Sequence, residues 1–457
     1  MSMGTRCIRL ASQYALVVVV GLTAAGWNCP VNAQDNSTTT NYVANIVGGV
    51  AVDLSGMLSN SKHDASGMLE RLSRDIQPIS GEMNQTAGLR KISLRRLEAE
   101  LKNNIGKPLP DAVSLLAGLQ SVRYVLFCPE QNDIILVGPA EGWKLDPRGY
   151  FLGAKSGRPV MLLDDLLVAL RTAIRSPSAL SCSINPTPEG IRRVEAFTRQ
   201  IQPGTDPRAA AAAIEEKLGP QRITINGIPD NSHFARVMVA ADYRMKRISM
   251  GLEPAPVQGL PAYTEMVKVS GSGMSNMSPR WWLEPAYQPL LRDEGSLAWE
   301  IRGAAVRCMT ENDFFDASGV ARASGRSDAV TQRWARLMTD RYQDLAQADP
   351  VFAQLQNCMD LAVVSSLIAK RRSAVDAGQE FPLLTGNVAG VPTLQLDAPK
   401  QVGPGASLAR KGRKTMVAAG GVQVNPWAMI DKAQTSTELV QVHQKLAVAP
   451  STSWWWD

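Results

Sequence analysis

The spacing of apolar side chains changes along the chain and predicts where helices and strands lie. Runs of β-forming residues between turn signals predict strands, whereas apolar residues three and four positions apart predict helices. Strands are expected at 123–128, 133–137, 180–184 and 221–228, and helices at 93–102, 111–119, 164–174, 187–201, 206–219 and 232–252. Because helices separate most of these strands, residues 91–255 predict a mixed, partly parallel sheet with covering helices.

A second pattern follows a Pro/Gly/Ser-rich linker at 256–279. Residues 280–372 begin with short strand-like runs that turn near 292–295, and end with helical patterns at 328–346 and 349–371. This module predicts a small antiparallel sheet plus two helices, so the fold class is α+β.

The two ends of the chain have weaker patterns. Residues 34–90 are rich in Ser, Asn, Thr and Gly and predict a flexible, low-order lead-in. Residues 373–457 predict a linker-like tail with one short strand in GGVQVNPWAM and a Trp-rich terminus.

Titratable side chains crowd around a histidine in the stretch SHFARVMVAADYRMKRISMGL, residues 232–252. On a helix capped by Ser232, the apolar side chains form one stripe at helical spacing. Asp242 lies four residues before Lys246, the spacing of an exposed helix ion pair that contributes ~0.2–0.5 kcal/mol. We therefore interpret the stretch as a helix with a solvated charged side, and His233 as structural rather than catalytic.

Residues 1–33 have the pattern of a signal peptide. Arg6 and Arg9 precede an apolar core at 15–25, and small or aliphatic residues lead to a predicted cleavage between Ala33 and Gln34. An uncleaved membrane anchor is the alternative, but the apolar core is short for a ~30 Å hydrocarbon layer. We expect an exported, periplasmic or envelope-associated protein without a transmembrane segment after cleavage.

The charge pattern narrows the choice of partners. The formal net charge is +6, and removal of Arg6 and Arg9 leaves +4, spread along the chain. A dispersed, mildly basic surface is compatible with anionic or glycan polymers of the envelope, and nucleic acid is not an expected partner.

Four cysteines remain after cleavage, and none has the spacing of a metal site. They are Cys128, Cys182, Cys308 and Cys358. In an oxidising compartment Cys308–Cys358 is the preferred disulfide, because both residues lie in the second module. The alternative is four buried thiols that act as small apolar side chains.

Recognisable catalytic motifs are missing from the sequence, and no catalytic residue, metal or cofactor is predicted. IVGG at 46–49 and the serine–lysine spacing of Ser59 and Lys62 lack their companion motifs. An acid/base pair for hydrolysis remains an alternative if carboxylates converge in three dimensions. The candidates are Glu141, Glu284, Glu300 and Asp313.

Aromatic and basic clusters favour binding over catalysis. Trp281 and Trp282, with Trp299, could form a platform for sugar rings, or alternate members could fill the core. The other candidate partner contacts are the basic residues Arg410, Lys411, Arg413 and Lys414, and the terminal Trp454, Trp455 and Trp456. Exposed indoles favour association, so we expect the terminus to dock into a groove of this chain or of a partner.

Four phrases of the sequence resemble an uncharacterised family of exported proteins of planctomycete-type bacteria. They are GPAEGW, SHFARVMVAADYRMKR, RWWLEP and FAQLQNCMDLAVVSSLI, and the likeness spans roughly 92–372, with PWAM and WWWD fitting too. The resemblance implies the compartment and the extent of the domains, but no activity.

These observations predict a cell-envelope protein that binds or scaffolds. One alternative is a glycan or peptide hydrolase of the envelope. Another is a subunit of a larger envelope assembly whose terminal WWWD inserts into a neighbour.

Overall fold

The computed structural model describes most of the chain from residue 50 onward. The described ranges are 50–53, 55–60, 81–202, 205–267, 277–303, 306–374, 381–386, 390–405, 407–408, 415–416, 418–447 and 455–457. The predicted signal peptide with Ala33 and Gln34, the basic residues 410–414 and Trp454 lie outside the described residues.

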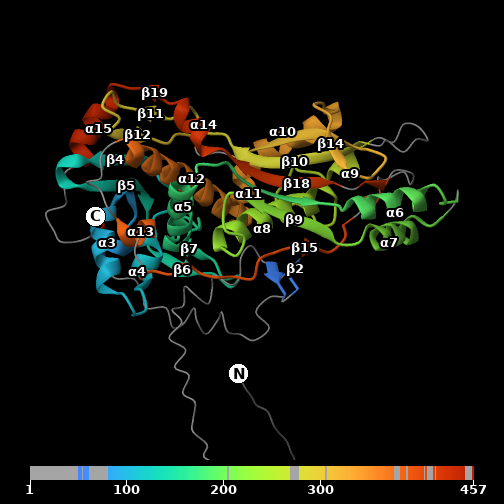
Figure 1. The fold of residues 1–457 in the computed structure, drawn as a ribbon, viewed down its shortest axis with the longest axis horizontal. Coiled ribbons are helices and arrows are strands. Elements are labelled where there is room, and N and C mark those ends of the chain that lie inside the picture. The colour runs from blue at the N-terminus through green and yellow to red at the C-terminus, as the bar shows by residue number, and fades with distance from the viewer. Residues whose placement is uncertain are drawn as a thin grey trace, which may run out of the picture. The chain divides into compact units, whose positions relative to one another are not determined.

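Two mixed sheets carry the fold (Figure 1). The larger has nine strands in the order β1 (Val50–Val52), β2 (Met57–Asn60), β15 (Gln401–Val402), β9 (Gln221–Asn226), β8 (Leu180–Asn185), β18 (Ala419–Val424), β10 (Met277–Pro285), β13 (Val306–Phe315) and β14 (Ala321–Ala323). Its neighbours are antiparallel except for the parallel pairs β2–β15 and β10–β18.

The second sheet has six strands. Their order is β19 (Gln434–Thr435), β11 (Leu291–Arg292), β12 (Ala298–Glu300), β4 (Tyr124–Cys128), β5 (Asp133–Ala140) and β3 (Ala87–Ser93). β4 and β5 form the predicted hairpin, and Asn132 adopts the left-handed conformation that its turn requires. Two further hairpins pair β6 (Trp143–Leu145) with β7 (Phe151–Gly153), and β16 (Ser407–Leu408) with β17 (Thr415–Met416).

Side-chain caps start many of the helices where the sequence predicts them. Ser93, Thr187, Asp206, Ser232 and Asp328 each accept a hydrogen bond from a backbone N–H in the first turn. The helices are α3 (Leu94–Asn103), α4 (Asp111–Ser114), α5 (Leu163–Arg175), α6 (Pro188–Thr198), α7 (Pro207–Leu218), α8 (His233–Ser249), α9 (Tyr263–Met266), α10 (Ala329–Asp340), α11 (Tyr342–Ala348), α12 (Pro350–Ala374), α13 (Pro382–Thr385), α14 (Pro426–Asp431) and α15 (Glu438–Leu446).

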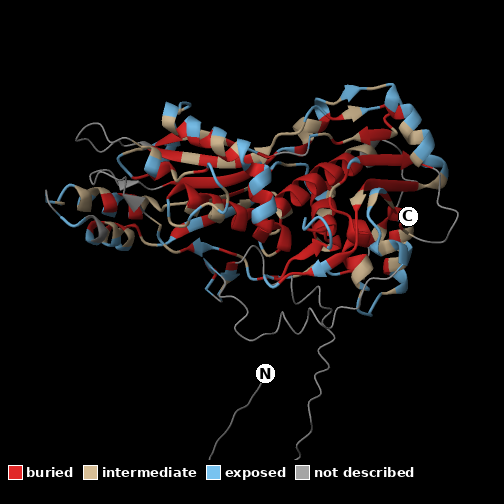
Figure 2. Cartoon of the chain, turned by 180° about the vertical axis from the view of Figure 1, so that it is seen from behind, coloured by how far each residue is buried: buried red, intermediate tan, exposed pale blue. Residues whose placement is uncertain are grey.

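Helix α12 lies in the core, where it packs against α5 and α8. Among the described residues, its stretch 350–371 alone has the length and apolar composition of a membrane span, and 94% of the 18-residue apolar window within that stretch is buried inside the protein. A helix that is apolar on all sides is expected in such a position, because neighbouring elements cover every face. Figure 2 shows buried positions gathered along the central helices and the inner strands.

Both sheets draw strands from both predicted modules and from the predicted tail. β18, within residues 373–457, lies between β8 of the first module and β10 of the second. Its side chains are mostly buried, because the strand has a neighbour on each edge and α8 packs on it. The described residues, 50–457 with their gaps, accordingly form one compact unit. The mixture of helices and partly parallel sheets confirms the predicted α+β class.

Candidate functional site

Helix α8 is buried on nearly all sides, which corrects the prediction of a solvated charged face. Ser232 caps it as expected, with its Oγ accepting from the Ala235 N–H at 3.1 Å. However, Arg236, Asp242 and Lys246 are all buried along with the apolar stripe. The reason is that β8 and β18 cover one side of the helix while α5 and α12 cover another.

Asp242 and Lys246 do not form the ion pair that their spacing predicts. The Lys246 ammonium donates instead to the Ile184 carbonyl at 3.0 Å and to Gln221 Oε1. The carboxyl of Asp242 lies near the backbone of Ile184 and packs against Gly420 of β18. A side chain larger than hydrogen at position 420 would collide with it, since an added Cβ would lie 2.2 Å from Asp242 Oδ1.

Burial shifts both titrations in the direction that removes charge. It raises the pKa of Asp242 to about 8, which makes this side chain a neutral carboxylic acid at neutral pH. It also lowers the pKa of Lys246 to about 8. The lysine ammonium donates to two oxygens, and the nearby Asp242 side chain opposes the downward shift of its pKa.

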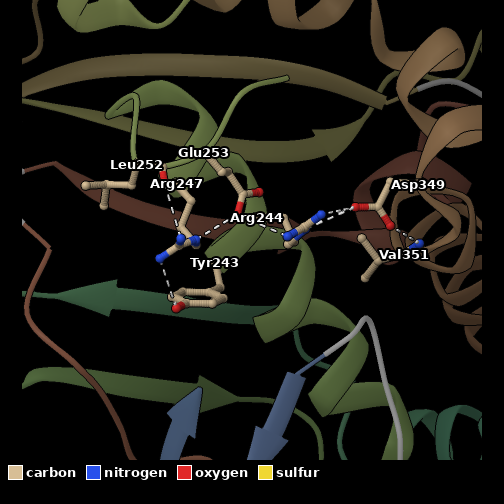
Figure 3. Close-up of polar contacts among 7 residues, drawn as sticks. All are labelled: Tyr243, Arg244, Arg247, Leu252, Glu253, Asp349 and Val351. Atoms are coloured by element: carbon tan, nitrogen blue, oxygen red, sulfur yellow. Dashed lines mark hydrogen bonds and ion pairs between the residues drawn. The ribbon is translucent and has the colours of Figure 1, made fainter. Parts of the chain in front are cut away.

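A four-residue charge network continues along the outer side of α8 (Figure 3). Glu253 Oε2 accepts from Arg247 Nε at 2.7 Å and from Arg244 Nη1 at 3.0 Å. Arg244 Nη2 also lies 2.9 Å from Asp349 Oδ2, at the start of α12. Arg247 uses its remaining nitrogens on the Leu252 carbonyl and the Tyr243 hydroxyl. Two guanidinium groups and two carboxylates therefore balance one another.

A cavity of about 240 Å³ lies beside the C-terminal half of α8. It is lined by Met57, Leu58, Ser59, Asn60, Gln221, Tyr243, Lys246, Arg247, Met250, Leu252, Val402, Gly403, Pro404 and Gly405. The walls are mainly apolar, and Lys246 and Gln221 supply polar groups. Three parts of the chain that are distant in sequence build this site, so no local motif marks it.

Lys246 can contribute one further hydrogen bond to this cavity. An ammonium group has three N–H donors, and two of them already point to Ile184 and Gln221. Gln221 is engaged on both ends, since its Nε2 donates to the Gly405 carbonyl at 3.4 Å. The arrangement suits a ligand that is largely apolar and that offers one acceptor.

His233 and Asp165 form a second buried pair, on α8 and α5. His233 Nδ1 lies 2.9 Å from Asp165 Oδ1, and the side chains are only 3% and 6% exposed. Burial by itself lowers the pKa of His233, but the Asp165 carboxylate outweighs it and the net shift is upward. Asp165 lies 68 residues from His233, so the sequence did not reveal the contact. Neither residue lines either of the two cavities described here, and the pair joins two core helices.

The predicted tryptophan platform does not form. Trp281 is in the core, with ring centroids 4.9 Å from Tyr263 and 4.8 Å from Trp334. Trp282 points to the opposite face of β10, where its Nε1 donates to Glu284 at 3.1 Å. Trp299 belongs to the other sheet and lines a second cavity. The alternative prediction, that alternate members fill the core, describes β10 correctly.

The C-terminus docks onto this chain's own six-stranded sheet. Residues 455–457 lie along β3, where Lys91 and Asp457 exchange two backbone hydrogen bonds of 2.9 Å. Trp456 pairs with Ile92 and is covered by the Arg90 guanidinium, 5.1 Å from the ring centroid. The indole at 456 is thus only 7% exposed.

The predicted Cys308–Cys358 disulfide is wrong. Both residues are buried free thiols, as are Cys128 and Cys182. Burial raises the pKa of Cys308 and Cys358 well above the usual thiol value, which makes them poor nucleophiles. The four thiols behave as small core side chains.

The four candidate carboxylates are each engaged separately. Glu141 is buried and accepts from the Ser156 N–H at 2.9 Å. The other three pair with arginines: Glu284 with Arg307, Glu300 with Arg123, and Asp313 with Arg280. None of the four lines either of the two cavities. Over the described ranges, no group of three or more His, Cys, Asp or Glu side chains could hold a metal ion.

Comparison with known proteins identifies a domain of unknown function that includes α8. The family described as "Protein of unknown function (DUF1598)" matches residues 182–263. No curated protein and no solved structure matches this chain. The matched segment contributes Gln221 and the lining residues of α8, but β2 and residues 402–405 are needed to complete the cavity.

Proposed function

We propose that this protein is a binding protein, and that the cavity beside α8 holds a small, largely apolar ligand with one hydrogen-bond acceptor. The observation that carries the proposal is that Lys246 lines a mainly apolar cavity and makes two hydrogen bonds with its ammonium group, which has three donors. A few placed polar groups on apolar walls are the usual composition of a small-molecule site.

The arginine that lines this cavity does not require an anionic ligand. The nearest guanidinium, that of Arg247, is already paired with Glu253 and engaged by Tyr243 and Leu252. An acceptor without a full charge, such as a carbonyl or ether oxygen, therefore fits the lysine N–H without disturbing the network.

The cavity volume sets the ligand size. A cavity of about 150 Å³ accommodates benzene, which has six heavy atoms. At the same ratio, a volume of about 240 Å³ corresponds to a ligand of roughly ten heavy atoms.

Two probes of matched shape test this proposal. Acetophenone carries a carbonyl acceptor and ethylbenzene does not, so ligand-observed NMR on the full chain should show tighter binding of acetophenone. Lys246→Met removes the donor and keeps the length of the side chain, so it should abolish the difference. We expect acetophenone to weaken by about fivefold or more, the cost of one buried hydrogen bond.

Ethylbenzene binding reports whether the variant still has an intact cavity. Lys144→Met, at an exposed lysine of β6, is the matched control and should leave both affinities unchanged. Equal binding of the two probes to the wild-type protein, or no binding of either, would contradict the proposal.

We also propose that the protein acts after export, in the periplasm or cell envelope. The proposal is supported by the basic start, the apolar core and the cleavage signal of residues 1–33. Fractionation of the producing cells followed by N-terminal peptide mass spectrometry tests it. A mature chain that begins at Gln34 in the exported fraction is expected, and an intact N-terminus in the cytoplasm would refute it.

A further inference from the structure

A second cavity, of about 270 Å³, lies at the end of the six-stranded sheet. Arg292 of β11 and Trp299 of β12 contribute to one side, and Lys370 and Arg371 from the last turns of α12 contribute to another. Asp431, at the end of α14, also lines it. Figure 1 shows β11, β19 and α14 together beside this part of α12.

Positive charge predominates in this cavity. Lys370 is paired with Asp431, the one acidic residue of the lining. Neither Arg292 nor Arg371 has an ion pair with any described residue. Arg292 Nη1 donates to the Ser296 hydroxyl at 2.9 Å, and Arg371 Nη2 approaches the Gly295 carbonyl at 3.5 Å. Both guanidinium groups retain N–H donors for an anion.

Apolar side chains form the rest of the wall. Trp299 is 6% exposed and lies beneath the Arg292 guanidinium, 6.0 Å from its ring centroid. Leu367 and Ile430 complete this part of the lining. The cavity therefore combines two unneutralised guanidinium groups with an apolar surface.

We propose that this second cavity binds a phosphate ester with a small apolar portion, held by Arg292 and Arg371. Guanidinium groups match the geometry of phosphate oxygens and form charge-assisted hydrogen bonds. Trp299 and its aliphatic neighbours take the apolar portion. By the benzene comparison, about 270 Å³ accommodates roughly eleven heavy atoms, the size of phenyl phosphate.

Isothermal titration of the full chain with phenyl phosphate tests the site. Inorganic phosphate, which lacks the ring, and phenol, which lacks the charge, should each bind at least tenfold more weakly. Arg292→Gln and Arg371→Gln should each weaken phenyl phosphate about tenfold or more, because each removes charged hydrogen bonds. Arg336→Gln, at an exposed arginine of α10, should leave the affinity unchanged.

The source of the phosphate ester is distinguished by a second arm with vesicles. Binding to phosphatidylcholine vesicles that contain phosphatidylglycerol, lost in Arg292→Gln and Arg371→Gln, would identify a lipid headgroup as the ligand. Binding of phenyl phosphate without vesicle binding would identify a soluble ester. If neither probe binds, or if binding is unaffected by both arginine substitutions, the proposal is wrong. Unfolding curves of the two variants show whether they are folded.

Discussion

Replacing Asp242 with asparagine should remove a loss of stability that the wild-type protein shows as the pH rises. The carboxyl is completely buried, and it packs against Gly420 of β18. Asparagine keeps the shape that fits against Gly420 but cannot ionise. The substitution therefore isolates the cost of keeping this carboxyl protonated.

The magnitude follows from the shift in its pKa. Burial raises the pKa of Asp242 from 3.8 to about 8, so the folded protein holds a proton that the unfolded chain releases. Its contribution to stability is complete below pH 3.8 and is lost as the pH rises toward 8. The loss is about 1.4 kcal/mol per pH unit, or roughly 3 kcal/mol between pH 5 and 7.5. Asp242→Asn does not show this loss. Any cost of burying the amide group is the same at both pH values and cancels in the comparison.

Urea unfolding of the wild-type protein and of Asp242→Asn at these two pH values measures the effect. The difference in free energy of unfolding should shift by roughly 3 kcal/mol in favour of the variant at the higher pH. Both measurements lie below the pKa of about 8 to which burial lowers Lys246, so that group contributes little. Asp340→Asn, at an exposed aspartate, should show no such shift. A constant difference would mean that Asp242 is ionised in the folded protein, and would refute the reasoning.

Three further substitutions test the core. Trp281→Ala should destabilise the protein by about 3–5 kcal/mol, whereas Trp282→Ala, on the half-buried face of β10, should destabilise it clearly less. Equal losses of unfolding free energy in urea would contradict the placement of Trp281 in the core and of Trp282 on the opposite face. Asp165→Asn breaks a buried pair and should cost roughly 3–5 kcal/mol. Because the pKa of His233 is raised, the pair stabilises the protein fully below pH 6.5. The loss of unfolding free energy in the variant should therefore become smaller as the pH rises through the folded-state pKa of His233. A loss that does not change with pH would count against a protonated His233. Deleting residues 455–457 should lower the melting temperature without changing the oligomeric state. A change of oligomeric state would instead indicate that these residues have a role in assembly.

Local chemistry predicted many of the elements correctly. The caps at Thr187 and Ser232 and the spacing of apolar residues behind them place α6 and α8 where the sequence indicates. The hairpin of β4 and β5 is likewise marked by its turn residues. Such features depend on hydrogen bonds and steric limits between residues that are close in the chain, so the sequence reports them directly.

Contacts between distant segments decided the candidate sites. Lys246 donates a hydrogen bond to the Ile184 carbonyl, and the cavity beside it is lined in part by residues near 57 and 403, which belong to no recognisable motif. Trp299 and Arg371 line the second cavity together although they lie in elements far apart in the sequence, β12 and α12. No short-range pattern encodes these approaches.

The sequence by itself thus determined the α+β class and the positions of many elements, whereas the tertiary structure decided which charged groups are buried. Periodicity separates apolar from polar faces of a helix, and it predicted a solvated side for α8. Whether that side meets water depends on which strand covers it, and β18 begins 170 residues after the end of α8 (419 minus 249). Burial against that strand raises the pKa of Asp242, because a charge is costly where water is excluded.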